Sequence, residues 1–165
     1  MIFVTVGTQY PFDRLLAAVD AWAANSGERV VAQVGGSPTR YPNLETVGFM
    51  SAEKFEDLLG EADLVVSHAG MGTIIECGLR DKPLIIFPRD HKLGEHTDDH
   101  QIGSATRMEN IGLAKVVHSI DELAPTLDEW KAIESRGIKA EPSGEILDSL
   151  RDFVYREGRE GSRKQ

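Results

Sequence analysis

Short apolar runs alternate along the chain with segments in which apolar residues recur every three or four positions. The apolar runs predict strands at residues 2–6, 30–34, 44–47, 64–66, 83–87 and 114–117. The helical spacing predicts helices at residues 12–24, 52–59, 73–79 and 98–110. Strands that are apolar throughout and alternate with helices are typical of parallel sheets covered on both faces. The pattern therefore predicts an α/β fold with a doubly wound, mostly parallel sheet.

Several polar or glycine-containing segments follow directly after predicted strands. They are residues 7–9, 35–36, 67–73 and 88–100. In doubly wound sheets, ligands bind beyond the carboxyl ends of the strands. We therefore expect these segments to share one edge of the sheet and to form the ligand site there.

The most informative segment is DLVVSHAGMGTIIE, residues 63–76, in which a strand leads through a glycine-rich turn into a helix. Free N–H groups at a helix start attract phosphate, so this turn is a candidate diphosphate site. His68 could donate a hydrogen bond to a phosphate oxygen, and Thr73 offers a hydroxyl group. Glu76 could accept the two hydroxyls of a ribose, or it could simply complement the helix dipole. The GxGxxG and Walker lysine patterns are both missing, which argues against a dinucleotide-binding fold and a P-loop.

A second polar segment, EHTDDHQ at residues 95–101, follows the strand at 83–87. Asp99 and Gln101 could read sugar hydroxyls. A metal-dependent hydrolase is an alternative, because His96 and His100 are four residues apart and His91 is near. The segment lacks the HExxH pattern, and histidines near acids are more often hydrogen-bonded or solvated, so we expect no metal.

The overall composition narrows the class of protein. The chain has 165 residues, a net charge of −9 and one cysteine, Cys77. The acidic balance argues against broad nucleic-acid binding, and a single cysteine excludes an intramolecular disulfide. We find neither a signal peptide nor an apolar run long enough to span a bilayer. These features predict a cytoplasmic protein.

Three stretches together resemble a known family, the C-terminal domain of family 28 glycosyltransferases. They are MIFVTVGTQ, SHAGMGTIIECGLRDKPLIIFPR and EHTDDHQ, and the resemblance runs from residue 1 to about residue 117. It implies a Rossmann-like domain, the C-terminal half of a GT-B fold, in an inverting hexosyltransferase. The donor substrate would be a UDP-sugar, and no cofactor would be needed. The chain is also similar to the short catalytic subunits of two-component exopolysaccharide and UDP-GlcNAc transferases.

The resemblance also implies roles for individual residues. His68, Gly70, Gly72 and Thr73 would hold the diphosphate, and His68 would be the catalytic group. Glu76 would bind the ribose. The sugar would be read by Gln101, with Asp99 and His100 beside it. Met50 would lie in the loop that meets the uracil, and Gly7 and Thr8 would form the turn that faces the acceptor.

Full-length relatives carry an acceptor-binding domain that the chain lacks, so the resemblance implies a membrane-attached partner subunit that binds a lipid-linked glycan acceptor. We expect one domain over residues 1–157 and a flexible tail over residues 158–165. A predicted C-terminal helix at 143–155 would pack on its own domain or on that partner. The protein would then be peripheral to the membrane. A non-catalytic nucleotide-sugar-binding module and a homodimer with two shared clefts are the alternatives.

Overall fold

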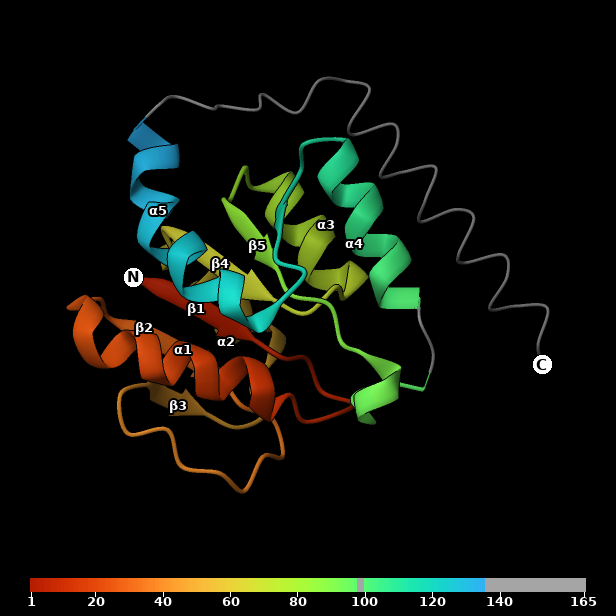
Figure 1. Cartoon of the computed structure of the whole chain (residues 1–165). Helices are drawn as coiled ribbons and strands as arrows, with labels where there is room; N and C mark the ends of the chain where they lie inside the picture. The colour runs from red at the N-terminus through yellow and green to blue at the C-terminus, as the bar shows by residue number, and fades with distance from the viewer. Residues whose placement is uncertain (98–99, 136–165) are drawn as a thin grey trace.

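The computed structural model describes residues 1–97 and 100–135, which form a six-stranded sheet with helices on both faces (Figure 1). The strands are β1 (Ile2–Thr5), β2 (Val30–Gln33), β3 (Glu45–Val47), β4 (Leu64–Ser67), β5 (Leu84–Ile86) and β6 (Lys115–Val116). The helices are α1 (Asp13–Ser26), α2 (Ala52–Glu61), α3 (Met71–Leu79), α4 (His100–Asn110) and α5 (Leu123–Ser135). Two short 3₁₀ helices, η1 (His91–Leu93) and η2 (Ile120–Glu122), complete the described elements. All of the predicted strands are present, and the predicted α/β class is confirmed.

The strands are all parallel and lie in the order β3-β2-β1-β4-β5-β6. β1 occupies the centre, with Thr5 at the same level as Gln33 of β2 and Ser67 of β4. The chain changes direction across the sheet at β1 and β4, and this switch point opens a crevice at their carboxyl ends. The topology therefore places a ligand site where the sequence predicts one.

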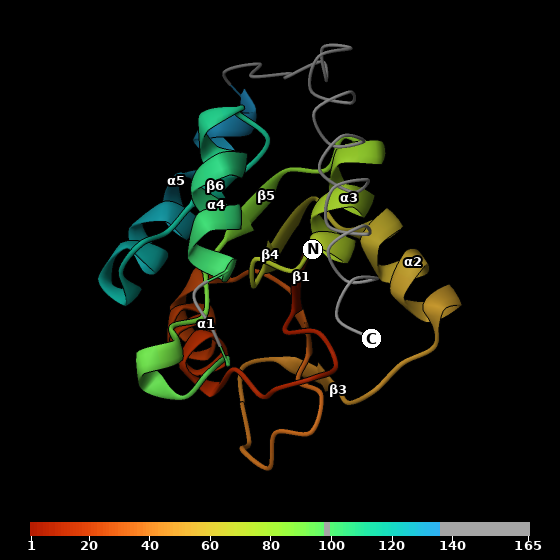
Figure 2. The same cartoon turned by 90° about the vertical axis from the view of Figure 1, so that its right-hand side faces the viewer.

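Alternate residues of the central strands feed two separate hydrophobic layers. On one face Ile2 and Val4 pack with residues of α1 and α5, including Leu16 and Leu127. On the other face Phe3 packs with residues of α2, α3 and α4. Figure 2 shows α1 and α5 on one side of the sheet and α2 and α3 on the other. Burial on both faces explains why these strands are apolar throughout rather than alternating.

The helix ends follow local chemistry. The Ser51 side chain accepts a hydrogen bond from the Lys54 N–H at 3.2 Å and caps α2. Gly27 ends α1 with a left-handed φ of 68°. α3 begins at Met71, two residues before the predicted start, because Gly70 takes the extended N-cap conformation. Gly72 therefore belongs to the first turn of the helix.

One described helix, α5, is not predicted from the sequence. It packs Leu123, Leu127 and Trp130 against the layer that contains α1. Within the described residues, each helix is too short or too polar to cross a bilayer. The predicted helix at 143–155, the predicted domain end at 157 and the tail at 158–165 lie outside the described residues.

Candidate functional site

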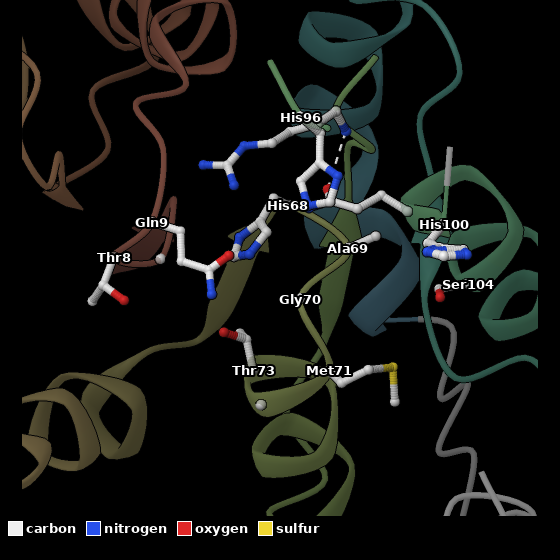
Figure 3. Close-up of a pocket in the computed structure, with 14 residues that line it drawn as sticks. Thr8, Gln9, His68, Ala69, Gly70, Met71, Thr73, His96, His100 and Ser104 are labelled. Atoms are coloured by element: carbon white, nitrogen blue, oxygen red, sulfur yellow. Dashed lines mark hydrogen bonds between the residues drawn. The ribbon is translucent and has the colours of Figure 1, made fainter. Parts of the chain in front are cut away.

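A pocket of about 530 Å³ lies at the carboxyl ends of β1, β4 and β5. Its lining comes from the turn after β1, the start of α3, the segment between β5 and α4, and the start of α4. The lining residues are Gly7, Thr8, Gln9, His68, Ala69, Gly70, Met71, Gly72, Thr73, Arg89, His96, His100, Gln101 and Ser104. In Figure 3, His68 lies between Thr8 and Gln9 on one side and His100 and Ser104 on the other. Three of the four segments predicted to share this edge do so, whereas residues 35–36 do not line the pocket.

His68 follows β4 and lies at the base of the pocket. Burial lowers its pKa to about 4, with a further contribution from the positive charge of Arg89. Its Nδ1 atom is buried and has no hydrogen-bond partner among the described residues. His68 is therefore neutral at physiological pH, so one of its ring nitrogens carries a proton and the other can accept a hydrogen bond.

Two glycines make room for the His68 ring. A Cβ atom at Gly70 would lie 2.3 Å from Nε2 of His68, and one at Gly7 would lie 2.8 Å from Cε1. Gly7 also has a positive φ of 72°, which side chains rarely adopt. At Gly72 nothing lies within 4 Å of an added Cβ. The first two glycines are therefore required by the histidine, and Gly72 alone borders open space.

The start of α3 supplies backbone donors. Gly70 gives no side-chain cap, and its carbonyl oxygen accepts the hydrogen bond from the Ile74 N–H at 3.1 Å. The N–H groups of Met71, Gly72 and Thr73 precede this first bond of the helix, and all three residues line the pocket. Such groups lack intrahelical partners and carry the positive end of the helix dipole. This end of the pocket is suited to an anionic group.

The opposite wall is held together by Arg89 and Gln101. The Arg89 backbone N–H donates to Oε1 of Gln101 at 3.2 Å. Gln101 is 7% exposed, and this bond leaves its amide NH₂ as the donor available to a ligand. His96 packs edge-on against the ring of Tyr10, with their centroids 5.8 Å apart.

The charge of the pocket differs from that of the chain as a whole. The full sequence carries a net charge of −9. The described lining nevertheless contains Arg89 and three histidines and no aspartate or glutamate. An acidic protein whose described pocket is free of acids is electrostatically suited to bind an anion there.

The pocket brings together eight of the eleven predicted site residues, namely Gly7, Thr8, His68, Gly70, Gly72, Thr73, His100 and Gln101. Glu76 does not line it; its carboxylate pairs with Arg80 one helical turn further on. Met50 does not line it either, because its side chain packs against the hydrophobic layer that contains Phe3. Asp99 lies outside the described residues.

The metal alternative receives no support from the described geometry. His96 and His100 line the pocket, but His91 does not, and its ring lies 3.9 Å from the Asp90 carboxylate. Across residues 1–97 and 100–135, no three histidine, cysteine or acidic side chains are placed to hold a metal ion.

Arg89 lines the pocket but was not singled out from the sequence. Arg89 follows Pro88 shortly after β5, inside a segment already assigned to the ligand edge, so its position was the available signal. A buried arginine is nonetheless hard to foresee, because arginine is seldom fully buried.

Comparison with known proteins finds a matching family. The family described as the glycosyltransferase family 28 C-terminal domain matches residues 1–152. A protein of Eremothecium gossypii named UDP-N-acetylglucosamine transferase subunit ALG13 is 35% identical over 118 residues, which cover 70% of this chain and 56% of that protein. The chain thus spans about half the length of this relative.

A second relative is the Prochlorococcus marinus protein named UDP-N-acetylglucosamine–N-acetylmuramyl-(pentapeptide) pyrophosphoryl-undecaprenol N-acetylglucosamine transferase. It is 28% identical over 123 residues, covering 72% of this chain and 33% of that protein. Among solved structures, the solution structure of ALG13 has a TM-score of 0.57 at 21% identity and covers 88% of this chain and 93% of that one. The glycotransferase of kitacinnamycin has a TM-score of 0.59 at 20% identity, over 95% and 40% of the two chains. At these identities the structures support the fold alone.

Proposed function

Because the chain belongs to the glycosyltransferase family 28 C-terminal domain family, we propose that it is the UDP-sugar-binding catalytic subunit of a two-component inverting glycosyltransferase. It would transfer a hexose or N-acetylhexosamine to a lipid-linked acceptor in polysaccharide synthesis. The nucleotide part of the donor is inferred from the relatives whose names contain UDP-N-acetylglucosamine.

The observation that carries the proposal is the charge of the pocket. Its described lining combines the open helix start of α3, the neutral His68 and the cationic Arg89, without an acidic side chain. A volume of about 530 Å³ is within the range of pockets that hold small-molecule ligands. These features suit a diphosphate with a sugar attached.

In the proposed reaction, an oxygen of the acceptor forms a bond to the anomeric carbon of the donor sugar. The bond between that carbon and the UDP oxygen breaks, and the proton of the acceptor hydroxyl passes to a base that we place on the partner subunit. Negative charge develops on the departing UDP. The α3 N–H groups and His68 would stabilise it, through preorganised donors that need no rearrangement. The protein would need no cofactor for this step.

The partner is proposed from the names of the relatives. The E. gossypii relative is named as a subunit, which implies at least one further chain in its enzyme. We propose a membrane-attached partner that binds the lipid-linked acceptor and closes the cleft over the pocket, so that the complex is peripheral to the membrane.

Glu76 tests the nucleotide role directly. We expect Glu76→Ala to weaken UDP binding strongly, because the carboxylate would release Arg80 and accept both ribose hydroxyls. Glu56→Ala is the matched control, since Glu56 is another exposed acid, 4.0 Å from Arg80. Calorimetry that finds equal UDP affinities for the two variants would remove the ribose role of Glu76.

Transferase activity tests the two-component arrangement. The chain alone should bind UDP-sugars without transferring sugar, and co-expression with the products of neighbouring genes should restore transfer to a lipid acceptor. Transfer by the isolated chain would contradict the need for a partner. If the chain binds UDP-sugars but transfers no sugar with any of the co-expressed proteins, the result would favour a non-catalytic nucleotide-sugar-binding module.

A further inference from the structure

Arg89 is a buried arginine at the base of the pocket. It is 2% exposed and is the third residue after the end of β5. One terminal nitrogen donates to the carbonyl oxygen of Val6 at 2.7 Å and also to that of Tyr10. The guanidinium carbon lies 5.2 Å from the centroid of the Phe12 ring. Its side chain therefore fixes the turn that carries Gly7, Thr8 and Gln9.

Among the described residues, the hydrogen bonds of the Arg89 side chain go to backbone carbonyls and not to an acid. Its Nε atom is buried there without a hydrogen-bond partner. The nearest acidic influence is Glu95, which is held instead by Arg14 through two hydrogen bonds of 2.7 Å. Burial lowers the pKa of Arg89, yet an arginine stays charged in a protein. Burying a cation without a hydrogen-bonded carboxylate among the described residues is costly, and an anion bound in the adjoining pocket would offset that cost.

The cation acts on the contents of the pocket. Arg89 lowers the pKa of His68, so its charge is felt at the ring in the centre of the site. The positive charge that disfavours a protonated His68 would attract a negative ligand bound at the same place. Because the site is partly shielded from water, this attraction is stronger than it would be in bulk solvent.

Arg89 contacts two walls of the pocket, one through its backbone and one through its side chain. Its N–H donates to Gln101 at the start of α4, while its side chain holds the turn after β1. The residue thus sets the spacing between two walls that come from distant parts of the chain.

We propose that Arg89 is the fixed counter-charge for the diphosphate in this pocket and the positioning residue for the turn after β1. The proposal rests on the proposed function, because it takes a nucleoside diphosphate as the ligand. On this proposal, the preference of the site for an anion comes from the Arg89 side chain at the base of the pocket.

The test compares UDP, UMP and uridine, which share the nucleoside and carry two, one and no phosphate groups. We expect Arg89→Met to lower the affinity for UDP by about ten-fold or more and to leave that for uridine within about two-fold. Arg89→Lys, which restores the charge, should recover part of the UDP affinity. Arg14→Met is the matched control, because the Arg14 guanidinium also lies near the Phe12 ring, 5.6 Å from its centroid, but is paired with Glu95 and does not line the pocket. It should lose UDP and uridine affinity equally or not at all.

A purely structural role would lower all three affinities together, and that result would overturn the proposal. If Arg89→Met fails to fold, the wild-type protein supplies the answer through the NMR signal of the Arg89 Nε–H. That signal should move on adding UDP and stay in place on adding uridine, and an unmoved signal at saturating UDP would reject the counter-charge role. If the wild-type protein binds none of the three ligands, the proposed function itself fails.

Discussion

The glycines at residues 7, 70 and 72 have different roles, although the sequence presents them alike. Gly70 and Gly7 leave space for the ring of His68, and Gly72 borders the empty part of the pocket. From the sequence, glycines were expected only to let the backbone approach a phosphate. Making room for the ring depends on where the His68 side chain packs, and that place lies beside Gly7, which is 61 positions away in the sequence.

These roles predict different effects for two alanine substitutions, one on UDP binding and one on stability. Gly70→Ala should displace the His68 ring and weaken UDP binding, because the new Cβ would lie 2.3 Å from Nε2. Gly72→Ala should raise the free energy of unfolding by about 0.5–1 kcal/mol, since alanine favours a helix and finds open space here. Urea denaturation and calorimetry on both variants would check this. Equal destabilisation by the two would contradict the crowding around His68.

His68 also predicts a dependence of stability on pH. Its pKa is about 4 in the folded protein and near 6.5 when unfolded. Above pH 6.5 both states are neutral and the group has no effect. As the pH falls below 6.5, the unfolded chain takes up a proton that the folded chain does not, so stability is lost.

Relative to His68→Asn, the wild-type protein should therefore lose about 2 kcal/mol of unfolding free energy between pH 7 and pH 5. Urea denaturation of both proteins at the two pH values measures the difference. A difference that is independent of pH would show that His68 is not buried as a neutral group.

At the scale of elements, continuous apolar runs made the strands predictable, because each central strand is covered on both faces. Helix α5 was missed for a local reason. Pro125 stands near its start and suggests a break, but a proline in the first turn is tolerated there. Leu123, Leu127 and Trp130 do recur at helical spacing once the proline is set aside.

The cap of α2 gives a prediction at this scale. Ser51→Ala removes the hydrogen bond to the Lys54 N–H and should lower the free energy of unfolding by about 1 kcal/mol. Ser51→Asp, which can still cap, should lose much less. UDP affinity should be unchanged in both, because α2 does not line the pocket. A loss in Ser51→Asp equal to that in Ser51→Ala would argue that the hydroxyl has another role.

For the whole molecule, parallel topology made the location of the site predictable but left its members uncertain. Segments after β1, β4 and β5 had to meet at one edge because the strands run in the same direction. The bond from Arg89 to Val6 joins residues 83 positions apart, so nothing near Arg89 in the sequence announces it. The side-chain positions of Glu76 and Met50 likewise depend on Arg80 and on the layer around Phe3.

Ligand binding should stabilise the molecule as a whole. If UDP binds only the folded chain, a concentration 100 times its dissociation constant should add about 2.7 kcal/mol to the free energy of unfolding. Thermal unfolding with and without UDP measures this, with Gly70→Ala as the control that should respond less. An unchanged midpoint at millimolar UDP would contradict the nucleotide assignment.

The pairing of Thr5 with Ser67 at the centre of the sheet has a kinetic consequence. The turns that carry Gly7 and His68 come together only after β1 and β4 have paired. That pairing closes a loop made of the whole segment between the two strands. Contacts of such long range are slow to form, so the pocket is absent until the sheet is nearly complete. Saturating nucleotide should therefore slow unfolding and leave the folding rate almost unchanged.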